Sequence, residues 1–522
     1  MKTCIKKIQD LKDVNIFDFN RTLSGYENNR KPFIGGNMIQ TNTTLKASPQ
    51  FRMLTEDQVE RIKRTAFKVL EEVGFKVLHA GVRKMLQSAG AIVQGESVKV
   101  PEFIVQGCLS SAPKGWTLYD RQGRRALDVS GRNSYFGTST ASPNTKDALT
   151  GEYHETRVKD LARAAKIADA LENIDWVMPM GSAQDVPAMA AELHEFFATV
   201  TNTTKPIVFL AYSPRGTELI YDMAAEVAGG MDKLREKPFL VLYPESISPL
   251  VMPAEVADRI FIAADRFLPQ MMGPSIQPGA TGPVTMAGAV AQGVAESMFC
   301  VVVAQLRNKG CPVGLGCNFG ILDMAQGLMS IGSPEMSLGL AAQAEVAQSL
   351  GLPTWGLAGA TDAKCLDAQS GAEAAFHILA QGQSGLNLIH DVGYMDMSMA
   401  CGVEQLVMSN DIIGMAKRFL SGFEVSDEHL ALDVISNVGP GGHYLQQEHT
   451  VKHFRKELWR SRIFTRQPFE RWKEEGSKDV ETLVREEIRR ILETHEPKSL
   501  PENVLTELER IKIKGEKELI CN

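Results

Sequence analysis

Aromatic and acidic side chains stand at the ends of several short apolar runs in the middle of the chain. His390 and Asp391 directly follow the apolar run 386–389, and Tyr243 and Glu245 lie at the end of another run. Basic residues are nearly absent from these positions. Proteins hold quaternary ammonium groups with aromatic faces beside carboxylates, and each cation–π contact contributes ~0.5–2 kcal/mol. The run ends therefore indicate a site for a cationic small molecule, whereas a phosphate would need basic donors.

The candidate site residues fall into groups by their chemistry. The aromatic side chains able to form a cage around an ammonium group are Phe136, Tyr212, Tyr243, Trp355 and Tyr394. The carboxylates able to face its positive charge are Glu245, Asp362 and Asp391. His390 and Gln277 could bind a carboxylate elsewhere on a substrate. Three of these residues, His390, Asp391 and Glu245, are the candidates for direct participation in catalysis.

Each candidate also has an ordinary structural interpretation. Aromatic side chains at strand ends can simply close the end of a barrel. A histidine at such a position can be a general base, a hydrogen-bond donor to a substrate, or an anchor for a loop. Asn318 and Asp323 also follow an apolar run, but the sequence assigns no role to them.

A second concentration of histidines lies at 443–453. His449 and His453 are four residues apart, so on a helix they would share one face, as zinc ligands do. Neither of the usual zinc motifs, HExxH or HxxEH, occurs here. We expect no metal bound by this chain. A zinc-dependent barrel hydrolase that uses these histidines, or His390 and Asp391, remains an alternative function.

The elements that must position these residues repeat regularly from residue 134 onward. Eight short apolar runs, each followed by a segment with helical periodicity, lie about 30 to 45 residues apart. The runs are 134–140, 175–180, 206–212, 239–246, 267–275, 312–320, 353–360 and 386–394. Parallel strands need helical crossovers, and eight such units close a barrel. We predict an α/β fold, a (β/α)8 TIM barrel, in which the run ends meet at one mouth.

An open, doubly wound sheet is the competing architecture, but it usually carries an early glycine-rich phosphate fingerprint, and none precedes Val158. The segments flanking the barrel are irregular. Thr55 and Gln58 have the spacing of a capping box, which predicts a helix that stops at Gly74. We predict four regions: a flexible N-terminal tail at 1–50, an N-terminal helical and β cap at 51–130, the barrel at 131–420, and a C-terminal helical extension at 421–522.

Composition excludes several classes of protein. The 522 residues carry a net charge of -7, so no basic field exists to attract nucleic acid. The longest apolar stretch, 287–304, is interrupted by Gln292 and Glu296 and is too short to span a membrane. The eight cysteines form no CxxC pair and follow no secretory leader, so we expect free thiols and a cytoplasmic location.

Several segments, in matching order from about 51 to 470, resemble the trimethylamine methyltransferase family. They are FRMLTEDQ at 51–58, VLEEVG at 69–74, PGATGPVT at 278–285, GSPE at 332–335, DAKCLDAQ at 362–369, and GGHYL at 441–445 leading to LW at 458–459. Each segment is weak alone, but together they are specific. The resemblance implies a barrel methyltransferase that demethylates an amine and passes the methyl group to Co(I) of a separate corrinoid protein.

Founding members of this family contain pyrrolysine, whereas this chain has only the twenty ordinary residues. It therefore resembles the non-pyrrolysine branch, whose members act on quaternary amines such as glycine betaine, proline betaine or carnitine. A quaternary nitrogen already carries its charge and leaves as a neutral amine, so no general acid is required. Catalysis could then consist of holding one N-methyl group in line with the acceptor.

The resemblance also implies that the barrel mouth admits a corrinoid (cobalamin) carried by the partner protein. Glycines at run ends would permit its close approach, and these are Gly279, Gly282, Gly316 and Gly320. Tight turns explain each glycine equally well. A binding protein that senses a quaternary amine without catalysis is a further alternative. The apolar barrel helices and the C-terminal extension lead us to expect a homo-oligomer.

Overall fold

The computed structural model describes residues 39–40, 46–47 and 51–521. The predicted tail at 1–50 therefore lies outside the described residues, apart from two short strands. One of them, β1 (Ile39–Gln40), pairs antiparallel with β8 (Asn133–Thr138). The other, β2 (Lys46–Ala47), pairs antiparallel with β24 (Phe423–Glu424).

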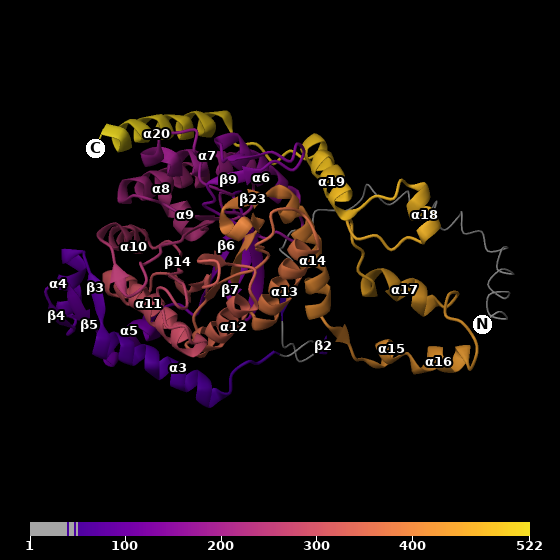
Figure 1. The fold of residues 1–522 in the computed structure, drawn as a ribbon, viewed down its shortest axis with the longest axis horizontal. Coiled ribbons are helices and arrows are strands. Elements are labelled where there is room, and N and C mark those ends of the chain that lie inside the picture. The colour runs from indigo at the N-terminus through magenta and orange to yellow at the C-terminus, as the bar shows by residue number, and fades with distance from the viewer. Residues whose placement is uncertain (1–38, 41–45, 48–50, 522) are drawn as a thin grey trace.

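Eight parallel strand positions form a closed ring at the centre of the molecule (Figure 1). Around the ring they are β8, the bridge residues Trp176 and Val177, β11 (Ile207–Phe209), β12 (Leu240–Leu242), β14 (Gln270–Met272), β16 (Val313–Gly316), β20 (Thr354–Leu357) and β21 (Leu388–Val392). The ring closes because Trp176 pairs with Gly137 of β8 and Val177 pairs with Ile207 of β11. The predicted TIM barrel is confirmed.

The second predicted run, 175–180, is reduced to those two bridge residues. Pro179 lacks a backbone N–H and Gly181 has a φ of 128°, so the chain leaves the sheet early. The other seven runs contain regular strands within their predicted bounds or one residue from them.

Helices cover the outside of the ring, one after each strand position. They are α6 (Val158–Ala170), α7 (Ala191–Asn202), α8 (Pro214–Ala228) followed by the short α9 (Met231–Glu236), α10 (Ala254–Arg266), α11 (Met286–Arg307), α12 (Pro334–Ser349), α13 (Ala368–Ser384) and α14 (Val403–Leu420). Within the described residues, α11 is the one helix long and apolar enough to cross a membrane, and 78% of its most apolar window is buried inside the protein. This helix is therefore a buried helix of the barrel layer.

Large side chains fill the inside of the ring. Tyr135, Trp176, Tyr243 and Trp355 belong to one buried cluster with Leu388. A hairpin of β6 (Gly115–Tyr119) and β7 (Arg125–Ser130) adds three more apolar side chains to this cluster, Leu118, Leu127 and Val129. Because this hairpin leads directly into β8, it closes the barrel at the amino-terminal end of the strands. The mouth at the opposite end stays available for a site.

The segment before this hairpin packs on the outside of α11. It contains α3 (Glu56–Lys68), a π-helical turn (Val69–Val73), β3 (Phe75–Val77), α4 (Ala80–Ser88), β4 (Ile92–Gln94), β5 (Ser97–Lys99) and α5 (Glu102–Ser111), and its sheet also includes β13 (Val251–Met252). The predicted capping box is present at Thr55 and Gln58. Phe75 stacks on Phe299 of α11, with ring centroids 4.0 Å apart.

Short strands and loops surround the mouth. A four-stranded sheet consists of β9 (Asn144–Lys146), β10 (Tyr153–Glu155), β22 (Tyr394–Met395) and β23 (Ala400–Gly402). Further along the rim, β15 (Ser275–Ile276) pairs with β17 (Asn318–Phe319), and β18 (Ile321–Asp323) pairs with β19 (Leu328–Ser330). These segments continue the barrel strands outward, and Tyr394, Gln277, Gly279, Gly282 and Gly320 lie on them or on the adjoining loops.

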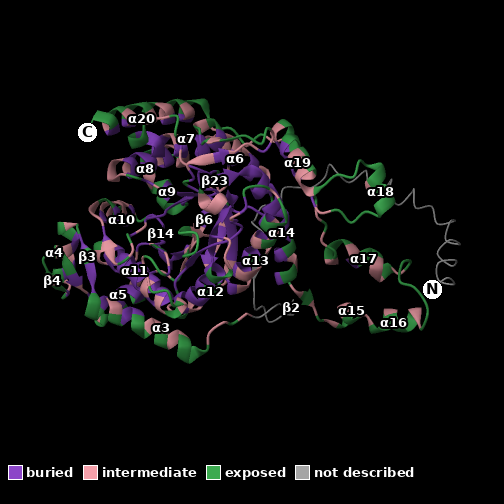
Figure 2. Cartoon of the chain, viewed as in Figure 1, coloured by how far each residue is buried: buried purple, intermediate pink, exposed green. Residues whose placement is uncertain are grey.

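After α14 the chain leaves the barrel, as Figure 1 shows at the right. The elements are α15 (Asp427–Leu430), α16 (Leu432–Val438), α17 (Glu448–Glu457), α18 (Phe469–Glu474), α19 (Val480–Thr494) and α20 (Glu502–Cys521). The last two return to the barrel, where α19 packs on α14 and α20 on α7 and α8. In contrast, α15 and α16 bury no residue, which is visible in Figure 2 as an absence of purple. We call residues 425–456 the arm.

Candidate active site

Three aromatic rings stack across the barrel, where Tyr243 comes from a strand that β14 and β16 separate from β20. Trp355 of β20 lies between Tyr243, which follows β12, and His390 of β21. The ring centroids of Tyr243 and Trp355 are 4.6 Å apart, and those of Trp355 and His390 are 4.4 Å apart. All three side chains are buried. The strand-end positions in the sequence correctly predicted that these residues would meet.

Asn318, at the start of β17, connects all three rings. Its Oδ1 accepts from Trp355 Nε1 at 3.2 Å and lies 3.5 Å from His390 Nε2. Its Nδ2 donates to the Tyr243 hydroxyl and to Glu245 Oε1, the latter at 3.3 Å. Asn318 was predicted at a strand end but without a role, because a neutral amide there has no chemical signature of its own.

Glu245 is the carboxylate closest to the ring stack. Its Oε1 accepts a 2.5 Å hydrogen bond from the Tyr243 hydroxyl, which also lies 2.9 Å from the Gly273 carbonyl. Burial raises the pKa of Glu245, and the hydrogen bond from Tyr243 and the proximity of His390 only partly oppose this effect. Burial and the adjacent Glu245 hold the pKa of Tyr243 well above its ordinary value, so the phenol remains a donor.

His390 and Asp391 form a close pair beside the stack. Nδ1 of His390 lies 2.6 Å from Oδ1 of Asp391, and both side chains are almost fully buried. Asp391 has a φ of 77°, in the left-handed region that residues with a side chain rarely adopt. The pairing of β21 with β8 shifts register between Ile389 and Val392, which accommodates this conformation. Backbone strain of this kind concentrates at functional sites.

The structure does not bring Phe136 to this cluster. Side chains alternate along β8, so Tyr135 enters the barrel interior and Phe136 packs in the outer layer between strands and helices. Tyr394 is buried, its hydroxyl donates to the carbonyl of Thr140, and burial together with the nearby Asp391 raises its pKa. Phe136 is therefore not placed to form part of a cage with Trp355.

Two further candidates serve neighbouring loops. Asp362 accepts from the Ser330 hydroxyl at 2.5 Å and from the backbone N–H groups of Ile331 and Gly332 at 2.9 and 3.1 Å. These three bonds anchor the loop before α12. Among the residues that the structure describes, the half-buried Gln277 bonds through its Nε2 only to Met329 Sδ, at 3.4 Å, and a thioether is a weak acceptor. Its amide therefore remains available to a ligand.

Tyr212 belongs to a separate acidic group at the end of β11. The side chain is 42% exposed, and its hydroxyl donates to Oε2 of Glu195 at 3.2 Å. Oε1 of Glu195 accepts from the Ala183 N–H at 3.0 Å and from the Ser182 hydroxyl at 3.2 Å. Burial raises the pKa of Glu195 to about 7. Sequence reasoning missed this carboxylate because it lies within α7, away from any strand end.

The four glycines proposed for the corrinoid divide into two pairs. A Cβ on Gly316 would lie 2.4 Å from Trp355 Cβ, and one on Gly320 would lie 2.2 Å from Met329 Sδ. The protein itself fills the space beside these two glycines, and it also does so beside Gly282, where a Cβ would lie 2.6 Å from Ile276 Cγ2. Gly279, with a φ of 94°, and Gly282 lie on the loop after β15, at the rim of the mouth.

Apolar side chains project from this rim. Val284 is 68% exposed, Met324 is 65% exposed and Leu328 is 51% exposed. The two loops that carry them adjoin, because a Cβ on Gly279 would lie 2.8 Å from Met324 Cε. Apolar side chains exposed together beside a site are typical of a surface that contacts another protein.

The family model for trimethylamine methyltransferase (MTTB) matches residues 24–519, nearly the whole chain. The chain belongs to the trimethylamine methyltransferase family. It is therefore a methyltransferase, and the family resemblance stated from the sequence motifs is confirmed.

Individual relatives cover most of the chain. It is 30% identical over 465 residues to the glycine betaine methyltransferase of Desulfitobacterium hafniense (strain Y51), which spans 88% of this chain and 96% of the relative. It is 29% identical to the trimethylamine methyltransferase MttB of Methanosarcina barkeri (strain Fusaro / DSM 804), across 90% and 96% of the two chains. The crystal structure of the Methanosarcina barkeri monomethylamine methyltransferase MtmB shares the fold, with a TM-score of 0.50, 12% identity, and coverage of 90% and 88%.

The histidines of the arm lie far from this site in the fold. His449 and His453 share one face of α17, with ring centroids 4.4 Å apart, as their spacing predicted. His453 Nε2 lies 3.1 Å from Glu428 Oε1. In the part of the chain that the structure describes, no three His, Cys, Asp or Glu side chains are arranged to hold a metal ion.

Proposed function

We propose that this methyltransferase takes a methyl group from a quaternary amine of the glycine betaine, proline betaine or carnitine type and transfers it to Co(I) of a corrinoid protein. The observation that carries the proposal is the half-buried Glu245, held beside the stack of Tyr243, Trp355 and His390 at the barrel mouth. Aromatic faces and a carboxylate together favour a permanent cation. The name of the glycine betaine methyltransferase relative supports the same substrate class.

The chemistry follows from the charge on nitrogen. When the C–N bond breaks, its electron pair stays on nitrogen, and the substrate leaves as a neutral tertiary amine. The acceptor supplies the pair for the new bond to carbon, so no proton moves in this step. Tyr243 therefore acts by holding Glu245 in place, and its raised pKa fits that role.

Attraction between the site and the ammonium group is strongest in the substrate and is lost as the methyl group leaves. Such binding does not itself lower the barrier, because catalysis needs interactions that are stronger in the transition state. We infer that the stack and Glu245 contribute by orienting one N-methyl group toward the mouth and by excluding water. They also favour product release, since the neutral amine binds less tightly.

A betaine also carries a carboxylate. Both ring nitrogens of His390 face groups of the protein, whereas the amide of Gln277 has only a thioether as its partner. Gln277 is therefore our first candidate for binding that carboxylate. In this proposal Asp391 acts through His390, and Glu245 is the group that faces the cation.

The methyl acceptor must approach from outside. We propose that a cognate corrinoid protein docks on the rim formed by Val284, Met324 and Leu328, beside the loop that carries Gly279 and Gly282. A corrinoid supplies a strongly nucleophilic cobalt when it is reduced. We also propose a cytoplasmic location and a homo-oligomer. The seven cysteines in the described residues are all free, as expected in a reducing compartment.

The test is anaerobic spectroscopy of the purified protein with reduced corrinoid, free or on a carrier protein. Glycine betaine, proline betaine, carnitine, choline and trimethylamine are offered in turn, and loss of the Co(I) absorption is followed. Turnover with one quaternary amine supports the proposal and identifies the substrate. Micromolar binding of a betaine with no transfer to any acceptor would instead favour a sensor, and turnover with trimethylamine alone would contradict the quaternary-amine class.

A further inference from the structure

The hydrogen bonds around Asn318 determine how its amide is oriented. The Trp355 indole Nε1–H can only donate, so the atom 3.2 Å away from it must be the amide oxygen. The amide nitrogen then faces the Tyr243 hydroxyl and Glu245 Oε1, both of which can accept. The opposite orientation would place N–H against N–H and oxygen against a carboxylate. The network therefore allows one orientation.

This orientation fixes a proton on His390. Its Nε2 faces the same amide oxygen at 3.5 Å, and an oxygen with no hydrogen requires Nε2 to be the donor. The other ring nitrogen, Nδ1, lies 2.6 Å from Asp391 Oδ1. Two lone pairs would repel at this distance, so one of the two groups carries a proton, although the two atoms are not aligned as a hydrogen bond. The pair is then either imidazolium with carboxylate or imidazole with carboxylic acid, and in both cases it is neutral overall.

The remaining groups determine the net charge of the site. Tyr243, Trp355 and Asn318 are neutral, and the His390–Asp391 pair carries no net charge. Glu245 is the one carboxylate of the cluster that no pair within the cluster neutralises. Burial raises its pKa, whereas His390 and Arg259 favour its charged form, and its Oε2 has no hydrogen-bond partner within the described residues. A single negative charge beside an aromatic stack matches a substrate with a single positive charge on nitrogen.

We propose that Asn318 is a positioning residue that holds the proton on His390 Nε2 and directs Tyr243 toward Glu245, so that the site presents one negative charge to the substrate. This inference rests on the proposed function for the identity of the substrate. The protonation pattern itself can be measured in the free protein, whatever the substrate is.

The first measurement is the side-chain ¹⁵N–¹H spectrum of the full chain labelled with [¹⁵N]histidine. The chain has ten histidines, and the signals of His390 are assigned by their loss in His390→Gln. We expect the Nε2 of His390 to have the shift of a protonated nitrogen in wild type. In Asn318→Leu, which keeps the branched shape of the side chain and removes both hydrogen-bonding groups, we expect both His390 signals to move. An unprotonated Nε2 in wild type, or unchanged signals in Asn318→Leu, would overturn the proposal.

Two controls separate positioning from general damage. Asn410→Ala removes another buried asparagine, which lies in α14 and accepts through its Oδ1 from the Asn173 N–H. This variant should leave the His390 signals in place. If Asn318→Leu does not fold, Trp355→Phe keeps a ring in the stack but removes the donor that orients the amide. It should also move the His390 signals, and unchanged signals would contradict the argument.

Binding gives the second readout. By calorimetry we expect Asn318→Leu to weaken binding of the quaternary amine by about tenfold or more, with Asn410→Ala near wild type. Equal affinity in Asn318→Leu and wild type would overturn the role of Asn318 in the site. If wild type binds no quaternary amine at all, the proposed function fails, while the histidine spectrum still decides the proton arrangement.

Discussion

At the scale of single residues, Glu245 provides the charge on which the proposed substrate class depends. Glu245→Gln keeps the size of the side chain and an oxygen for the Tyr243 hydroxyl, but removes the negative charge. We expect the affinity for a quaternary amine to fall by about 10- to 100-fold, because each factor of ten corresponds to ~1.4 kcal/mol. Calorimetric titration of both proteins measures the change.

A neutral ligand of the same shape isolates the effect of charge. An analogue in which a tert-butyl group replaces the trimethylammonium group should bind wild type and Glu245→Gln with similar affinity. If the substitution weakens both ligands equally, Glu245 contributes shape and not charge, and the cation-binding proposal is wrong.

Glu195 gives a prediction about pH. Its pKa is raised from 4.5 to about 7 by burial, so between these pH values the folded protein keeps a proton that the unfolded chain has released. The free energy of unfolding should therefore fall as pH rises through this window, by up to about 3 kcal/mol, and show no further loss from this group above it. Glu195→Gln removes the contribution, and the Tyr212 hydroxyl can accept from the new amide.

The measurement is urea unfolding of wild type and Glu195→Gln from pH 5 to pH 8. The free energy of unfolding of Glu195→Gln relative to that of wild type should increase across this range and then become constant. Glu236→Gln changes an exposed carboxylate and should track wild type. A constant difference between Glu195→Gln and wild type at all pH values would show that Glu195 does not hold its proton in the folded state.

Sequence position predicted part of the site for a physical reason. A residue at the end of a parallel strand reaches the barrel mouth whatever its exact register, which explains Tyr243 and Glu245, whereas Trp355 and His390 lie within β20 and β21. The face to which a side chain points depends on register, and a shift of one residue exchanges inside for outside. This is why Phe136 was expected at the site while its neighbour Tyr135 enters the barrel interior.

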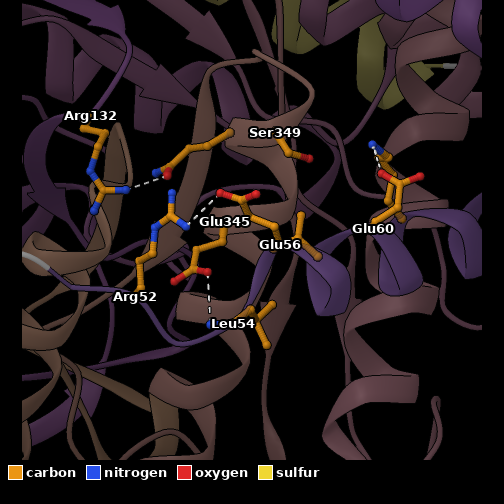
Figure 3. A pocket seen from close by; sticks show the side chains of 10 residues that line it. Arg52, Leu54, Glu56, Glu60, Arg132, Glu345 and Ser349 are labelled. Carbon is orange, nitrogen blue, oxygen red and sulfur yellow. Dashed lines mark hydrogen bonds and ion pairs between the residues drawn. The ribbon is translucent and has the colours of Figure 1, made fainter.

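At the scale of elements, α3 depends on one carboxylate from α12. Glu345 accepts from the backbone N–H groups of Met53 and Leu54, at 2.6 and 3.1 Å, just before α3 begins. Figure 3 shows Glu345 between Arg52 and Leu54 in a groove on the outside of the barrel, with a volume of about 300 Å³. Glu345 therefore connects α12 to the segment just before α3.

We expect Glu345→Ala to weaken the contact between α12 and the segment before α3, because two backbone N–H groups lose a charged acceptor. The local stability of this contact should fall by ~1–3 kcal/mol. Hydrogen exchange should accelerate over residues 51–68 and change little in the barrel strands. Ser349→Ala alters the same groove without touching these donors, so its exchange should match wild type. Unchanged exchange in Glu345→Ala would mean that apolar packing alone holds α3.

The elements themselves were largely predictable, because regular strands form in seven of the eight apolar runs and a helix follows every run. The second strand was overestimated, since a run of apolar residues does not reveal that Pro179 and Gly181 end the pairing after two bridges. The paths of the loops over the mouth were not predictable, because β15, β17, β18 and β19 pair with one another across long distances in the sequence or depend on tight turns.

At the scale of the whole molecule, the two ends of the barrel have different surfaces. Each barrel helix returns the chain to the amino-terminal end of the strands, so α14 ends on the side opposite the mouth, where the arm begins. The rim with Val284 and Met324 lies at the mouth itself. A carrier protein at the rim and a second copy of the chain at the arm would therefore not compete.

The arm is the part of the described chain that most needs a partner. With four and seven residues, α15 and α16 are far shorter than helices that are stable alone, and neither buries a residue. Seven large apolar side chains of the arm are exposed, namely Val425, Leu430, Leu432, Ile435, Tyr444, Leu445 and Val451. Packing against another copy would bury them, which supports the proposed homo-oligomer.

We therefore expect the full chain to sediment as a dimer or larger assembly, and the double variant Leu432→Asp, Leu445→Asp to sediment as a monomer, because each carboxylate would have to lose its hydration in the interface. Val284→Asp makes the same kind of change at the rim, where Val284 is 68% exposed. It should leave sedimentation unchanged and slow methyl transfer to the carrier protein. A wild-type monomer, or an assembly that survives both arm substitutions, would show that the arm does not join copies of this chain, and a Val284→Asp variant with full transfer would place the carrier elsewhere.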